Sequence, residues 1–135
     1  MNNVITYLFN LAFDTGISFI WTDKLKSNTP SCAIPEMNKI IINSSWHNQN
    51  ELPFQIAHEI AHVLNRDEGV LYYSSYSSHS KTEANANNKA IDILLKYVDE
   101  TSELSGNYSA FMEVYGIPYL LEENVKRRYA IYYSY

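Results

Sequence analysis

Apolar positions in the central part of the chain recur at helical spacing over two stretches. Over residues 50–65, the aliphatic side chains fall on one arc of a helix, with Asn50 suited to cap its start and Pro53 tolerated in its first turn. Over residues 80–98, a second apolar stripe includes alanines that keep the helix surface slim. The pattern therefore predicts two helices that can approach each other closely.

The N-terminal part of the chain carries shorter periodic segments. Apolar residues within 4–12 predict a helix that stops near Gly16, and residues 17–21 have the composition of a strand. Residues 31–34 and 39–43 are expected to pair as a hairpin around a turn that contains proline. Together these segments predict a small antiparallel sheet.

The C-terminal third is rich in aromatic residues. Gly116 is placed to end one helix and Pro118 to begin the next, which gives a helix-turn-helix outline. At 135 residues the chain is long enough for one core but leaves no room for a separate regulatory module. We therefore expect a single α+β domain over residues 1–135, in which the small sheet packs on the central helix pair and further helices follow.

The first central helix carries the sequence His58-Glu59-Ile60-Ala61-His62. Two histidines four residues apart lie on one face of a helix, close enough to share a metal ion. Glu59 then projects beside the metal, where it can take a proton from a metal-bound water. The alternative is a solvated helix face with two surface histidines. The motif predicts half of a catalytic zinc site, with Glu59 as its general base.

A catalytic zinc site requires a third protein ligand, and three carboxylates follow the motif. Asp67 and Glu68 come first, but a site of the metzincin type would need glycine where Asn65 stands. Glu83 falls inside the apolar stripe of the second central helix, and a carboxylate that faces a core is costly unless it is paired or binds a metal. Its alternative role is a capping box with Ser80. We favour Glu83 as the ligand.

Three segments of the chain resemble the ImmA/IrrE-type zinc metallopeptidases of bacteria, phages and mobile elements. They are KIIIN at 39–43, FQIAHEIAH at 54–62 and KTEAN at 81–85. In that family the glutamate of the third segment completes a zinc site like that of thermolysin, in a minimal gluzincin-like domain. The resemblance implies that His58, His62 and Glu83 bind Zn²⁺ and that Glu59 is the catalytic base.

The resemblance also implies a substrate, namely a helix-turn-helix transcriptional repressor of a phage or mobile element whose cleavage relieves repression. The main alternative is an antirepressor that binds such a repressor without cutting it and keeps zinc as a structural element. Glu59 favours the peptidase, because a closed structural site has no use for a base at that position. A third possibility is a compact DNA-binding regulator that uses the basic residues 126–128.

Net charge and cysteine content limit the expected classes of partner and the expected cellular compartment. The net charge of −5 argues against direct nucleic-acid binding, because phosphate contacts need a basic surface. Cys32 is the sole cysteine, which we expect to be a lone loop thiol in a reducing compartment. No signal peptide and no membrane-spanning run is evident. We expect a cytoplasmic protein that acts on a protein substrate, and the pattern predicts no particular oligomeric state.

The linker between the two central helices, residues 66–79, is rich in hydroxyl groups. Tyr72, Tyr76 and His79 are candidates to donate a hydrogen bond to an oxyanion, and for each the alternative is an ordinary loop side chain. We retain His79 as a second catalytic candidate because it directly precedes the second helix. A sheet edge beside the metal helix can also bind an extended peptide, and the expected edge is Lys39–Asn43.

Overall fold

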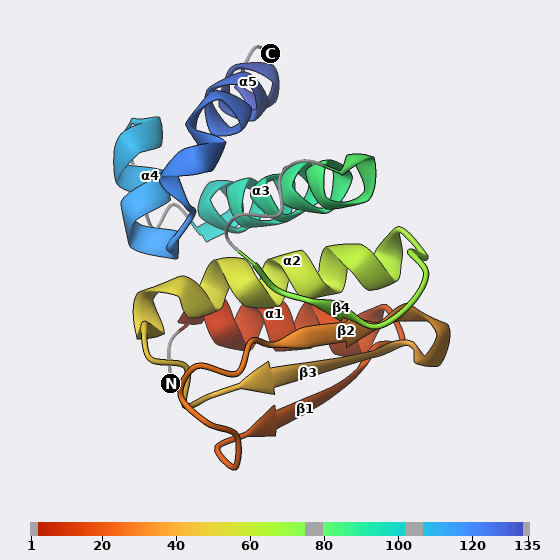
Figure 1. The fold of residues 1–135 in the computed structure, drawn as a ribbon. Coiled ribbons are helices and arrows are strands. Elements are labelled where there is room, and N and C mark those ends of the chain that lie inside the picture. The colour runs from red at the N-terminus through yellow and green to blue at the C-terminus, as the bar shows by residue number, and fades with distance from the viewer. Residues whose placement is uncertain (1–2, 75–79, 102–106, 134–135) are drawn as a thin grey trace.

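A computed structural model describes residues 3–74, 80–101 and 107–133 of the chain. Within these ranges the chain forms five α-helices, four strands and three short 3-10 helices (Figure 1). In chain order they are α1 (Asn3–Asp14), β1 (Ser18–Thr22), β2 (Cys32–Ile34), η1 (Pro35–Met37), β3 (Lys39–Asn43), η2 (Gln49–Glu51), α2 (Leu52–Leu64), β4 (Leu71–Tyr72), α3 (Lys81–Thr101), α4 (Tyr108–Tyr115), η3 (Tyr119–Leu121) and α5 (Glu122–Tyr132). The α+β class is confirmed.

The four strands form one sheet in the order β1-β3-β2-β4. The predicted hairpin of β2 and β3 is confirmed, and Asn38 takes the left-handed conformation that closes it, with φ 48°. β1 pairs with β3 in parallel, so the sheet is mixed and the prediction of a wholly antiparallel sheet is wrong. The parallel pairing arises because the chain passes from β1 to β2 first and then returns through β3 between them.

The prediction that Lys39–Asn43 forms the sheet edge is also wrong. This segment is β3, which is bonded to β1 on one side and to β2 on the other. Ile40 and Ile42 have no exposed surface, and a strand this apolar is best buried between two neighbours. The edges of the sheet are β1 and β4, and the two-residue β4 had no recognisable periodicity in the sequence.

Helix α2 lies at the centre of the molecule. It packs against α1, β2 and β3 on one side and against α3 on the other (Figure 1). Every residue from Leu52 to Val63 is buried, including both histidines. The alternative of a solvated face with surface histidines is therefore wrong. The helix begins at Leu52 rather than at Asn50, which lies in the preceding 3-10 turn η2.

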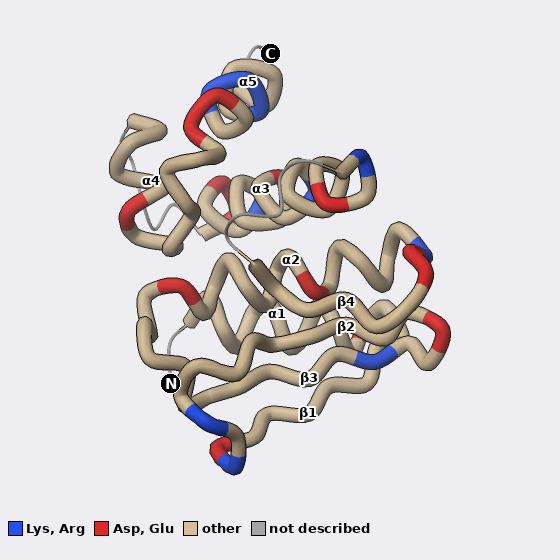
Figure 2. The backbone as a smooth tube through the Cα atoms, in the orientation of Figure 1, with Lys and Arg blue, Asp and Glu red and all other residues tan. Residues whose placement is uncertain are grey.

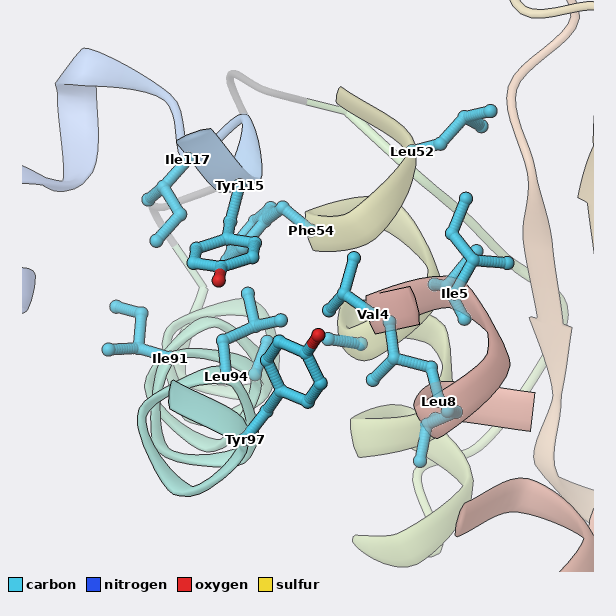
Figure 3. Close-up of a cluster of buried hydrophobic side chains, with 14 of the residues drawn as sticks. Val4, Ile5, Leu8, Leu52, Phe54, Ile91, Leu94, Tyr97, Tyr115 and Ile117 are labelled. Carbon is cyan, nitrogen blue, oxygen red and sulfur yellow. The ribbon is translucent and has the colours of Figure 1, made fainter. Parts of the chain in front are cut away.

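The main core lies where α1, α2, α3 and the C-terminal elements meet. Figure 3 shows aliphatic and aromatic side chains from these elements pointing toward one another. The labelled members of this cluster are Val4, Ile5, Leu8, Leu52, Phe54, Ile91, Leu94, Tyr97, Tyr115 and Ile117. Their contacts fix α3 against α2, which is the pair of helices that carries the candidate ligands. None of the helices in the described ranges has the length and apolar character to cross a membrane.

Helix α5 is held to α3 by charged side chains. Figure 2 shows charges of both signs on α5. The Arg128 guanidinium donates through Nε to Oδ1 of Asp92 at 2.9 Å, which joins α5 to α3. Lys126 Nζ lies 3.5 Å from Glu123 Oε1 within the same helix and above the ring of Tyr108. Two of the three consecutive basic residues thus have partners within the chain.

Gly116 forms a tight corner between α4 and η3. Its φ is +71°, and a Cβ there would lie 2.0 Å from the backbone oxygen of Asn50. We expect Gly116→Ala to lower the free energy of unfolding by about 3 kcal/mol or more, because left-handed strain and a backbone clash add together. Gly16 is the matched control, since its φ is +79° and no heavy atom lies within 4 Å of the added Cβ. Gly16→Ala should cost about 1 kcal/mol. Chemical denaturation of both variants checks this, and equal losses would contradict it.

Candidate metal centre

The side chains of His58, His62 and Glu83 converge between α2 and α3. His58 Nε2 lies 3.0 Å from Glu83 Oε1, and His62 Nε2 lies 3.1 Å from Glu83 Oε2. The two Nε2 atoms are themselves 3.0 Å apart. Ala86 and Ala90 have no exposed surface, and their small side chains let α3 approach α2 closely. The three residues are placed to bind a metal ion.

The capping box that the sequence allowed for Glu83 is formed only in part. Its backbone N–H donates to Ser80 Oγ at 3.1 Å, so Ser80 does cap the start of α3. Its carboxylate contacts the two histidines instead of completing a reciprocal capping box. The Ser80 cap therefore fixes the backbone at Glu83, while the Glu83 carboxylate contacts the two histidines.

The ionisation of Glu83 and His58 suits a metal site. Burial by itself raises the pKa of Glu83, but hydrogen bonds with His58 and His62 outweigh burial and lower the pKa to about 2. Burial lowers the pKa of His58, which keeps its imidazole neutral. Metal ions bind carboxylates and neutral imidazoles, so both groups are in the form that a ligand requires.

His62 is held from both ends of its ring. Asp67 Oδ2 lies 2.8 Å from Nδ1, while Nε2 faces the centre. Burial lowers the pKa of His62, but hydrogen bonds with Glu83 and Asp67 raise it overall. The two carboxylates beside the His62 ring create a negative potential there. This potential favours a protonated imidazole or a bound metal ion. Asp67, a candidate third ligand in the sequence, instead orients His62, and Glu68 is exposed outside the cluster.

We expect Asp67→Ala to weaken metal binding by a factor of about 10–100, because removal of a carboxylate that orients a ligating histidine has this effect elsewhere. The His62 ring would lose its fixed tautomer and orientation. Competition with a chromophoric chelator measures the change in affinity. The exposed neighbour Glu68 supplies the control, since Glu68→Ala should bind metal as the wild type does. If the two variants bind the metal with equal affinity, Asp67 does not support the metal site.

Glu59 lies in the same buried region but has no partner. Its side chain has no exposed surface, and within the described part of the chain neither carboxylate oxygen has a hydrogen-bond partner. Burial, and then the negative charge of Glu83, raise its pKa well above the usual range. Gln55, one turn earlier on α2, is equally buried and unpartnered within the same ranges. A buried carboxylate without a partner is characteristic of a functional group rather than a structural one.

Tyr73, directly after β4, was not singled out by the sequence. It is 5% exposed, and its ring meets the His58 ring in a T-shaped contact with 5.4 Å between centroids. Its hydroxyl has no partner among the described residues. Tyr72, which the sequence did single out, is 58% exposed. Adjacent strand residues point to opposite faces, so recognising β4 would have been the signal that separates these two tyrosines.

Three other residues named in the sequence analysis have different outcomes. Tyr76 and His79 lie outside the described residues, so the role of His79 stays a prediction. Cys32 is a buried free thiol in β2, where a loop thiol was expected, and it is not part of the group around the metal position.

A match to a known protein family covers both segments of the centre. Residues 14–125, more than half of the chain, match the peptidase M78 family model, described as the IrrE N-terminal-like domain. No curated protein and no solved structure gives a significant match to the chain. The matched range contains both segments that supply the converging side chains, and a family of metal-dependent peptidases indicates metallopeptidase-type function with a protein substrate. The chain therefore belongs to the IrrE N-terminal-like family of M78 peptidases.

Proposed function

We propose that this protein is a zinc-dependent endopeptidase that cleaves a helix-turn-helix transcriptional repressor. The observation that carries the proposal is the fully buried, unpartnered Glu59 beside a converging pair of histidines and a carboxylate. Two imidazoles and one carboxylate are a donor set of catalytic zinc sites, which leave one position open. Ligands about 2.0–2.1 Å from a tetrahedral zinc are separated by about 3.3 Å, and the observed separations of 3.0–3.1 Å support this fit.

A zinc ion held by His58, His62 and Glu83 would polarise the substrate carbonyl and make a water molecule more acidic. Glu59 takes the proton of the attacking water and then delivers it to the leaving amine nitrogen. Burial and the negative charge of Glu83 raise the pKa of Glu59, and a raised pKa makes its carboxylate a stronger base toward water. Asp67 keeps His62 in one orientation throughout.

The sheet edge offers a place for the substrate chain. In the described ranges β4 pairs only with β2, so its other edge has no strand partner among these residues, and Tyr73, directly after β4, packs against Phe54 and His58 of α2. An extended peptide that adds to such an edge makes main-chain hydrogen bonds of no particular sequence. The repressor itself is proposed from the family resemblance. The edge supports only the binding of an extended segment, such as an interdomain linker.

An antirepressor that binds without cutting is the second candidate, and one observation favours it. His58, Glu59 and His62 are each at most 1% exposed, which is the arrangement of a closed structural site. The test is to incubate the zinc-loaded protein with a helix-turn-helix repressor and analyse the products by mass spectrometry. Two fragments with a single new terminus support the peptidase. An intact repressor that co-elutes with the protein in gel filtration supports the antirepressor and contradicts cleavage.

A further inference from the structure

The candidate site is closed in this structure. His58, Glu59 and His62 have at most 1% exposed surface each, and the Glu83 side chain has 14%. A peptidase must bring a main-chain carbonyl of its substrate next to the base and the metal. The inference drawn from this closure rests on the proposed function: since no polypeptide can reach Glu59 here, a segment that covers the site has to move.

The short edge strand β4 has few backbone attachments within the described part of the chain. We call residues 71–73 the Tyr73 strap, and they comprise β4 and the tyrosine that follows it. β4 has two residues and pairs through Cys32 and Ala33 of β2, and the Tyr73 N–H donates to the Ser31 oxygen at 2.8 Å. Helices α2 and α3 hold the candidate ligands themselves and share the main core. Tyr73 is the member of the strap that belongs to the core, through its ring contacts with Phe54 and His58, so lifting the strap withdraws that one side chain.

The side chain of Tyr73 connects the strap to the centre. Its ring packs edge-on against His58, at 5.4 Å between centroids, and against Phe54, at 6.3 Å. Among the described residues, Tyr73 is the aromatic side chain outside α2 that contacts the His58 ring.

The closed arrangement leaves polar groups unsatisfied. The Tyr73 hydroxyl and both oxygens of Glu59 are buried without a partner in the described ranges. Water would reach all three once the strap lifted, and their hydration offsets part of the free energy needed to separate the Tyr73 ring from α2. Gly69, just before the strap, has φ +88° and open space around its Cβ position, so the backbone can change direction there. These features bring the closed and open states closer in free energy.

We propose that the Tyr73 strap closes the metal centre in this structure and lifts to admit substrate, with the Tyr73 ring as its contact on His58. Opening separates β4 from β2 and exposes Glu59. Closing buries the base again when no substrate is bound. This arrangement restrains a peptidase whose centre would otherwise be continuously accessible.

The register of β4 on β2 provides a reversible test. Cys32 faces Tyr72 directly, and Tyr72 is exposed, so Tyr72→Cys places two thiols opposite each other. Facing residues in an antiparallel ladder have Cα atoms about 4.5–5.5 Å apart, within the span of a disulfide. Oxidised glutathione should cross-link the variant, which thiol titration verifies, and dithiothreitol should reverse it. Tyr72→Ser under the same oxidant is the control.

We expect the cross-linked variant to cleave repressor at least about tenfold more slowly than its reduced form and to release zinc to a chelator more slowly by a similar factor. The control should show neither change. A verified cross-link with unchanged cleavage and unchanged zinc release would overturn the strap. If the reduced form and the wild type retain zinc but do not cleave, the proposed function fails instead, and zinc release still tests the strap.

A second measurement needs neither zinc nor substrate. Hydrogen exchange of the Tyr73 amide, which is bonded to Ser31, reports how often the strap opens. Tyr73→Phe removes the unpartnered hydroxyl and keeps the ring, so it should slow this exchange about tenfold, whereas Tyr73→Ala should accelerate it. Opposite directions for these variants support the strap. If both accelerate exchange, or if neither changes it, Tyr73 is only a core side chain and the proposal is wrong.

Discussion

Glu59→Gln should reduce peptide cleavage by a factor of about 10²–10⁴ and leave zinc binding unchanged, because it removes proton transfer without removing a ligand. Glutamine keeps the shape of the side chain but cannot take a proton from water. The change also replaces a buried, unpartnered carboxylate with a neutral group, so the variant should be at least as stable as the wild type.

Three measurements check this expectation together. Cleavage rates on the repressor give the loss of activity, elemental analysis gives the zinc content, and thermal unfolding gives the stability. Glu68→Gln is the matched control, because Glu68 is exposed and lies outside the converging group. It should resemble the wild type in all three. A Glu59→Gln variant that still cleaves at the wild-type rate would show that another group is the base.

Glu83→Ala should weaken zinc binding by more than the factor of about 100 that loss of an outer partner can produce, because it removes a ligand. It also removes the carboxylate that contacts both histidines. Zinc at about 100 times its dissociation constant stabilises a folded protein by about 2.7 kcal/mol, so the wild type should unfold at a higher temperature with zinc than without. The variant should show no such shift at the same concentration.

The control for this variant comes from the same helix. Glu100 forms an exposed pair with Lys96 at 3.8 Å and hydrogen-bonds Tyr7, and its loss should cost about 1 kcal/mol. Glu100→Ala should therefore keep the zinc-dependent shift of the wild type. If Glu83→Ala also keeps the shift, the third ligand is another residue.

The local part of the site was accessible to sequence reasoning. His58 and His62 are four residues apart on one helix, so their relation follows from helical geometry without any knowledge of the fold. Glu83 is a candidate because its carboxylate falls in an apolar stripe, and in the structure that carboxylate contacts both histidines. Each inference needed only the periodicity of a long helix.

The features that sequence reasoning did not predict depend mainly on contacts between residues distant in sequence. The parallel pairing of β1 with β3 follows from where the chain re-enters the sheet, which residue spacing does not specify. The three consecutive isoleucines of β3 did contain a signal for a central strand, and the edge prediction overlooked it. Asp67 reaches His62 because Arg66 adopts a left-handed φ of 57° at the end of α2, and no glycine announces that turn.

Gly116 lies far from the candidate ligands in the sequence, but it packs against the segment that leads into α2. Its contact with the Asn50 backbone lies two residues before α2 begins, so the C-terminal elements brace the start of the helix that carries both histidines. The family match ends at residue 125, beyond this corner. We therefore expect truncation upstream of α4 to remove a support of the candidate metal centre, and a minimal fragment that keeps the centre has to include the corner.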